Sequence, residues 1–146
     1  MTMTDLEVHE SELRLIPGLD IEVAETLRAL KAAANDERPR LVDTTMLYAP
    51  RSGGVKRYLL SKKAWIAANR PGVSHSLIVP GARHKAGRDD IIKLRATKLP
   101  FGDGYRWPSS VRRWSAWVAA MKPSIIEAGD PYTPGQGALE AGQRVG

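Results

Sequence analysis

Residues 41–55 read LVDTTMLYAPRSGGV, and this stretch decides the fold class. Its first part, residues 41–47, predicts a strand, whereas Pro50 and the pair Gly53-Gly54 predict a loop. The same alternation continues along the chain. Helices are predicted over 55–68, 111–121 and 134–144, and further strands over 73–79, 91–94 and 124–128. Such alternation implies βαβ units, so we expect an α/β fold with roughly four parallel strands in the order 3-2-1-4 and helices on both faces.

The residues before this body differ from it in charge. Residues 1–38 carry nine acidic and four basic side chains, whereas residues 39–146 carry seven acidic and eighteen basic ones. A helix is predicted over 20–34, with Asp20 as its cap, after the turn signal Pro17-Gly18. We therefore divide the chain into an acidic helical arm, 1–38, with a small contribution to the core, and a basic body, 39–146. The basic body favours an anionic partner such as nucleic acid, a phospholipid surface or a nucleotide-linked substrate.

Composition excludes several classes of protein. The chain has 146 residues, of which 42% are hydrophobic and 26% charged, which suits one globular domain and excludes wholesale disorder. The absence of cysteine excludes zinc ribbons, thiol nucleophiles and iron–sulfur clusters. The sequence has no apolar run long enough to span a bilayer, and its acidic N-terminus does not resemble a signal peptide. We expect a cytoplasmic protein, or one held peripherally at a membrane.

The loop at residues 50–55 is the first candidate site. It joins a strand to a helix at the carboxyl end of a parallel strand, where ligands bind in such folds and where helix amides favour an anion. Gly53 and Gly54 would let the backbone approach a phosphate, although a tight turn explains them equally simply. The loop lacks both the Walker pattern and the dinucleotide fingerprint.

The second candidate site follows the last predicted strand. Asp130 is interpreted either as a general base or sugar-binding group, or as the cap of the next helix, while Glu127 faces the same crevice or is an ordinary polar strand residue. His75 is predicted to be structural. His84 lies in a basic loop and is predicted to be solvated, with an anion contact as the alternative. The three histidines lack the spacing of a metal site.

Four short motifs follow one another along the chain. They are the loop and helix start Pro50–Tyr58, the strand end Ile78–Gly81, the pair Lys122-Pro123 before the strand 124–127, and Asp130–Tyr132 after it. Their order resembles the N-terminal domain of GT-B glycosyltransferases of the family-four type. The resemblance covers residues 39–146 and implies a Rossmann-like, three-layer parallel sheet. Lys56 stands where an acidic residue is more usual, and Gly129 where many members have histidine.

The resemblance also implies an activity, namely transfer of a sugar from a nucleotide-diphosphate donor to an acceptor without an essential metal or other cofactor. It places the amides of Gly53 and Gly54 against the donor diphosphate, where they would stabilise the leaving group. Arg51 and Arg57 become candidates for anion contacts, and Glu127 for substrate binding. Asp130, on the acceptor side, becomes the catalytic candidate.

The donor-binding domain of that family is missing from this sequence. We therefore expect the chain alone to be inactive, with a C-terminal domain on another chain as a partner besides the nucleotide sugar and acceptor. We also expect an exposed sheet edge near Ile125 and Ile126 through which the chain self-associates. The alternatives are an inert remnant and a basic nucleic-acid-binding module. The module would use Trp107, Trp114 and Trp117 beside its cations, although helical spacing makes the last two more typical of a core.

Overall fold

A computed structural model describes residues 20–51 and 53–146. The elements run in the order α2 (Asp20–Ala34), β1 (Arg40–Thr44), α3 (Gly54–Asn69), β2 (Ser74–Gly81), β3 (Lys85–Ala86), β4 (Ile91–Arg95), β5 (Thr97–Lys98), β6 (Arg106–Trp107), α4 (Val111–Ala120), β7 (Ile125–Ala128) and α5 (Thr133–Val145). Every predicted helix and strand is present, and α2 has the predicted bounds. Two short features escaped the sequence analysis, namely β3 and the hairpin of β5 and β6.

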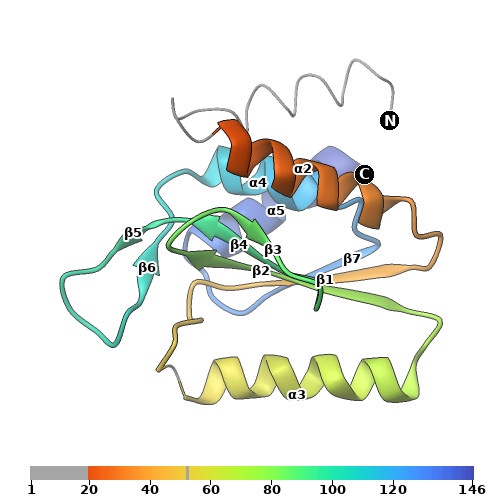
Figure 1. Ribbon diagram of the computed structural model, residues 1–146, viewed down its shortest axis with the longest axis horizontal. Coiled ribbons are helices and arrows are strands. Elements are labelled where there is room, and N and C mark those ends of the chain that lie inside the picture. Colours follow the sequence, from red (N-terminus) through yellow and green to blue (C-terminus); the bar gives the residue numbers. More distant parts are fainter. Residues whose placement is uncertain (1–19, 52) are drawn as a thin grey trace.

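The main sheet has five strands in the order β3-β4-β2-β1-β7. β4, β2, β1 and β7 are parallel to their neighbours, which confirms the predicted order 3-2-1-4 of the parallel strands, and β3 adds an antiparallel edge. Helices α2, α4 and α5 cover one face of this sheet and α3 covers the other (Figure 1). The fold is therefore α/β with a mostly parallel sheet between two helical layers.

Two hydrophobic clusters lie on the two faces of the sheet. The larger one joins α2, α4 and α5 to the strands and includes the fully buried side chains of Val42, Ile78 and Trp117. The smaller one, under α3, is built around Leu59, Leu77 and Val79. A cluster on each face is expected, because parallel strands buried between two helical layers are apolar on both faces.

Helix α2 belongs to the larger cluster. Val23, Leu27 and Leu30 are 4%, 5% and 1% exposed and pack with residues of α4 and the sheet. The expectation that the acidic arm contributes little to the core is therefore wrong for residues 20–34. Glu25 lies on the exposed face of this amphipathic helix and Glu22 is half-buried, whereas the apolar stripe docks on the body irrespective of the net charge. The part of the arm before residue 20 lies outside the described residues.

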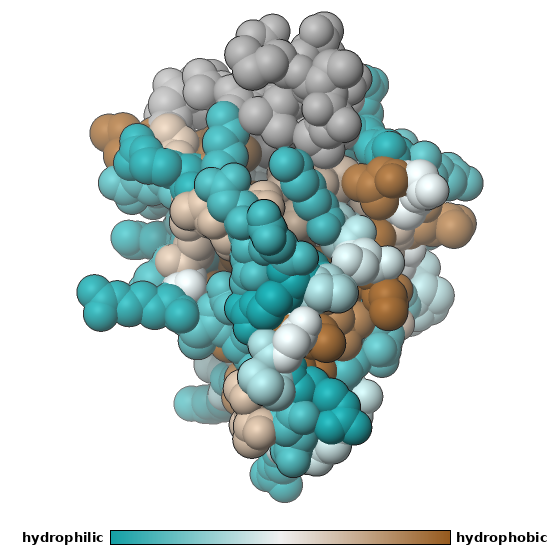
Figure 2. Space-filling view, turned by 90° about the vertical axis from the view of Figure 1, so that its right-hand side faces the viewer, coloured by the Kyte–Doolittle hydropathy of each residue, from teal (hydrophilic) through white to brown (hydrophobic). Residues whose placement is uncertain are grey.

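Strand β7 forms one edge of the sheet and pairs with β1. The side chain of Ile125 is 63% exposed there, and a groove of about 720 Å³ between β7 and α5 is bordered by Ile126, Ala138 and Leu139. The end of the molecule at which the parallel strands begin is otherwise mostly hydrophilic, with hydrophobic side chains gathered toward one side (Figure 2). The exposed edge predicted from the sequence is thus present; the self-association expected of it stays a prediction.

Candidate anion-binding site

The parallel strands end on the side of the molecule from which the β5–β6 hairpin projects (Figure 1). An open cavity of about 410 Å³ lies there, beside the ends of β1 and β2. We call it the basic cleft, because four of its lining side chains are cationic and none is acidic. Its lining residues are Tyr48, Ala49, Pro50, Lys56, Pro80, Gly81, Ala82, Lys93, Lys98, Gly104 and Arg106.

The cations of the basic cleft are not neutralised by described carboxylates. Lys56 Nζ lies 3.5 Å from the carbonyl oxygen of Pro50 and 5.2 Å from the ring centroid of Tyr48. Arg106 donates to the carbonyl oxygen of Ala96 at 2.9 Å. Burial, aided by the negative charge of Asp89, raises the pKa of Tyr48, so its hydroxyl stays protonated and able to donate. The cleft is therefore suited to a ligand that carries negative charge and accepts hydrogen bonds.

The glycine loop borders this cleft at the start of α3. Gly53 is the N-cap residue, with φ −86° and ψ −90°, and the first turn of the helix has neither a side-chain cap nor an acidic residue. A Cβ atom added at Gly53 or Gly54 would meet nothing within 4 Å. Neither packing nor a left-handed backbone thus requires these two glycines, and they leave open space beside unsatisfied helix amides.

The predicted cationic contacts of this loop are separated in the structure. Arg57 and Gly53 line a shallow groove along α3 that shares Pro50 and Lys56 with the basic cleft. Arg51 is exposed and lines neither cavity. Lys56, Lys93, Lys98 and Arg106 were not singled out from the sequence as ligand-binding residues, because they come from four separate segments that only the fold brings together.

Asp130 is 8% exposed and ties two loops together. Its Oδ2 atom accepts hydrogen bonds from the Thr45 hydroxyl at 2.8 Å and from the Met46 amide at 2.7 Å, and its Oδ1 atom accepts one from the Tyr132 amide at 3.0 Å. It does not cap the first turn of α5, whose N-cap residue is Tyr132. The carboxylate joins the loop after β1 to the loop after β7, and a catalytic role for it stays a prediction.

Glu127 belongs to a charged cluster beneath α3. Its carboxylate lies 2.7 Å from Lys62 Nζ, which also lies 3.0 Å from the buried carboxylate of Asp43. The second partner of Asp43 is His75 Nε2, at 2.6 Å. Burial opposes ionisation of Asp43, but the hydrogen bonds from His75 and Lys62 outweigh it and hold the pKa of the carboxyl below its usual value. Burial likewise works against the charge of Lys62, yet its two carboxylate partners raise its pKa.

This cluster gives Glu127 and His75 structural contacts. Glu127 is exposed, but its carboxylate is already engaged by Lys62 on the α3 face, and it lines none of the cavities described above. His75 is buried within β2, as predicted. The sequence analysis did not identify Asp43 or Lys62. The available signal was the position of Asp43 inside an apolar strand, because a buried carboxylate requires a charged or hydrogen-bonding partner.

A comparison with protein-family models, curated proteins and solved structures finds no match to this chain. Within the described ranges, no three histidine or acidic side chains are grouped as a metal site would require. None of the helices that the structure describes has the length and hydropathy needed to cross a lipid bilayer.

Proposed function

We propose that this chain is the acceptor-side domain of a nucleotide-sugar-dependent glycosyltransferase, and that phosphate groups of its substrate occupy the basic cleft. One observation carries the proposal: four cations without described carboxylate partners surround a cavity at the carboxyl ends of β1 and β2. Ligands of open α/β sheets bind at this end of the strands. Two of the four motifs that resemble the family-four transferases line the same cavity, since Pro50 and Lys56 belong to the first motif and Pro80 and Gly81 to the second.

The chemistry of sugar transfer fits such a cleft. Negative charge builds up on the departing diphosphate, and fixed cations and helix amides stabilise that charge. The uncapped start of α3 and the Lys56 side chain would stabilise this charge from the helix, and Lys93 would do so from β4. Because no carboxylate lines the cleft, it lacks a base for the acceptor hydroxyl. We therefore expect the chain alone to bind a nucleoside diphosphate and to turn over nucleotide sugars only at background level.

The structure offers less to the nucleic-acid alternative. Trp114 and Trp117 are 3% and 1% exposed and belong to the core, so neither can stack on a base. Trp107 is 41% exposed, with its ring centroid 5.7 Å from that of Tyr132. Trp107 and Tyr132 do not line the basic cleft, and neither do the other exposed aromatic side chains of the described residues, Tyr58, Trp65 and Phe101. A compact cleft without such rings suits a small phosphorylated ligand better than a long phosphate backbone.

Calorimetric titration of the purified chain with UDP, GDP and ADP tests the proposal. At least one diphosphate is expected to bind with an affinity that falls as salt rises, and the matching nucleoside is expected to bind much more weakly. The double variant Lys56→Ala/Lys98→Ala should lose about tenfold in affinity, as expected when charged hydrogen bonds are removed. Arg28→Ala, which removes an exposed cation on α2, is the matched control and should bind normally.

Two results would contradict the proposal. One is diphosphate binding that the double variant leaves unchanged, because the ligand would then occupy another surface. The other is tight binding of a single-stranded oligonucleotide with which no nucleoside diphosphate competes, because that behaviour belongs to a nucleic-acid-binding module.

A further inference from the structure

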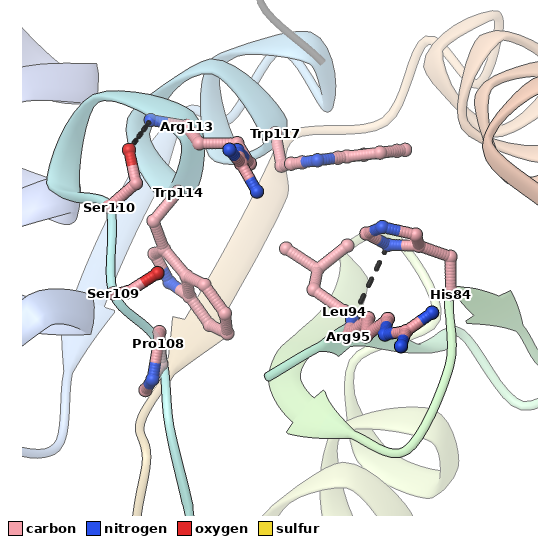
Figure 3. A pocket seen from close by; sticks show the side chains of 9 residues that line it. All are labelled: His84, Leu94, Arg95, Pro108, Ser109, Ser110, Arg113, Trp114 and Trp117. Atoms are coloured by element: carbon pink, nitrogen blue, oxygen red, sulfur yellow. Dashed lines mark hydrogen bonds between the residues drawn. The ribbon is translucent and has the colours of Figure 1, made fainter. Parts of the chain in front are cut away.

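A second, smaller cavity lies between the end of β4 and the start of α4 (Figure 3). Its volume is about 30 Å³, and it shares no lining residue with the basic cleft. We call it the α4 pocket. It is lined by His84, Leu94, Arg95, Pro108, Ser109, Ser110, Arg113, Trp114 and Trp117.

Two buried N–H groups at this pocket have no partner. Trp117 is 1% exposed, and its indole Nε1 atom forms no hydrogen bond with any described residue. The Nε atom of Arg113 is buried and equally unpaired. Figure 3 shows the Arg113 guanidinium beside Trp117, above the gap between Trp114 and Leu94. Because buried polar groups are nearly always hydrogen-bonded, two orphan donors at one cavity indicate an acceptor that belongs there.

The start of α4 adds further donors. Ser110 is the N-cap residue, and its hydroxyl oxygen accepts from the Arg113 amide at 3.1 Å, so that its own proton remains available. The helix has ten residues, with none acidic in its first turn, so its dipole is not offset there by a carboxylate. Ser109 and Arg95 are exposed and form the rim through which a ligand can enter.

His84 closes the pocket from the other side. It is 7% exposed, which corrects the prediction that it is solvated, and its ring stacks on Trp117 with 5.4 Å between the centroids. Its Nδ1 atom accepts from the Arg95 amide at 3.4 Å, so the proton lies on Nε2. Burial lowers the pKa of His84, and the positive charges of Arg113 and Arg95 lower it further, against an opposing effect of Glu22.

We propose that the α4 pocket is a specific site for one phosphate-sized oxyanion, held by Arg113, the Trp117 indole and the start of α4. The polar side chains that line it are donors or can donate, and no carboxylate is among them. A single water molecule accepts only two hydrogen bonds, whereas the oxygen atoms of a phosphate accept several. The volume exceeds the roughly 10–15 Å³ that a single water needs, which suits a larger acceptor-only group. The site stands independently of the glycosyltransferase proposal.

The test uses His84 as a local reporter. We titrate inorganic phosphate to tens of millimolar and keep the ionic strength constant with chloride. The imidazole NMR signals of His84 are expected to shift in a saturable way. The pKa of His84 is expected to rise, because a bound anion offsets the positive charges of Arg95 and Arg113. The signals are assigned with His84→Gln. A second titration adds glycerol phosphate. Competition by this ester would show that the pocket accepts a phosphomonoester, whereas phosphate binding with which the ester does not compete would identify the free ion as the ligand.

Two variants probe the donors, and a third separates the two cavities. Arg113→Gln is expected to weaken phosphate binding at least tenfold, and Trp117→Phe, which removes one N–H and no charge, by a few-fold. Lys98→Ala in the basic cleft should leave the His84 response unchanged. If Arg113→Gln or Trp117→Phe fails to fold, the presence or absence of a saturable His84 shift in the wild-type protein decides whether the pocket binds phosphate. The absence of a saturable shift, or an equal shift in Arg113→Gln, would overturn the proposal.

Discussion

Replacing Leu30 by alanine measures how firmly α2 belongs to the core. Leu30 is 1% exposed and lies in the cluster that α2 shares with α4 and the sheet. The substitution removes three carbon atoms, at about 0.8 kcal/mol each, and adds roughly 1 kcal/mol for a cavity that closes only in part. The free energy of unfolding should therefore fall by about 3 kcal/mol. For a chain of this length that corresponds to a decrease in Tm of roughly 10 °C.

The assay is urea unfolding followed by tryptophan fluorescence, with Ile21→Ala as the matched control. Ile21 lies on the same helix but is 76% exposed, so its replacement should change the free energy of unfolding by less than about 0.5 kcal/mol. Similar m-values in all three proteins would show that the comparison concerns the same transition. If Leu30→Ala proved as harmless as Ile21→Ala, then α2 would be the dispensable arm that its charge suggested, and the packing argument would fail.

Three further predictions concern the sheet and its loops. Asp130→Ala should lower the free energy of unfolding by roughly 2–3 kcal/mol in urea titrations, because it leaves the buried Met46 amide without a partner. The pKa of Asp43 is lower in the folded than in the unfolded protein, so ionised Asp43 stabilises the fold above the ordinary carboxyl pKa, and this stabilisation is lost as pH falls through the folded-state pKa. Asp43→Asn should therefore reduce the dependence of the free energy of unfolding on pH at acid pH. An unchanged dependence in this variant would contradict the prediction. Sedimentation should detect weak dimers at high concentration that Ile125→Lys abolishes, whereas equal association of both proteins would exclude the β7 edge.

The sequence predicted the parallel strands and their order because each element carries its own periodicity and its own turn signals. The role of α2 was misjudged because net charge was taken as a measure of packing, although Leu27 and Leu30 already formed the stripe that docks. β3 and the β5–β6 hairpin were missed because strands of two residues leave no periodic pattern.

The sites were harder to predict than the fold. The basic cleft and the α4 pocket gather side chains from segments far apart in the chain, and no local spacing reveals such a set. His84 shows the difficulty: its neighbours in sequence are charged, yet it is buried by stacking on Trp117, more than thirty positions away in the chain. The glycine loop lies between a strand and a helix start, as its local motif predicted, and Gly53 borders a groove there; its role in binding stays a prediction.

Helix α3 is attached to the sheet by few apolar side chains and by two lysines. Of its sixteen residues only Leu59 and Ile66 are buried, while Lys62 reaches Asp43 and Lys63 donates to the carbonyl oxygen of His75 at 2.7 Å. Elements with few apolar contacts open at lower free energy than the rest of a domain. The backbone amides of α3 should then exchange their hydrogens with solvent through a local opening that depends on salt concentration. An anion that contacts both Lys56 on this helix and Lys93 on β4 would stabilise the closed state and slow that exchange.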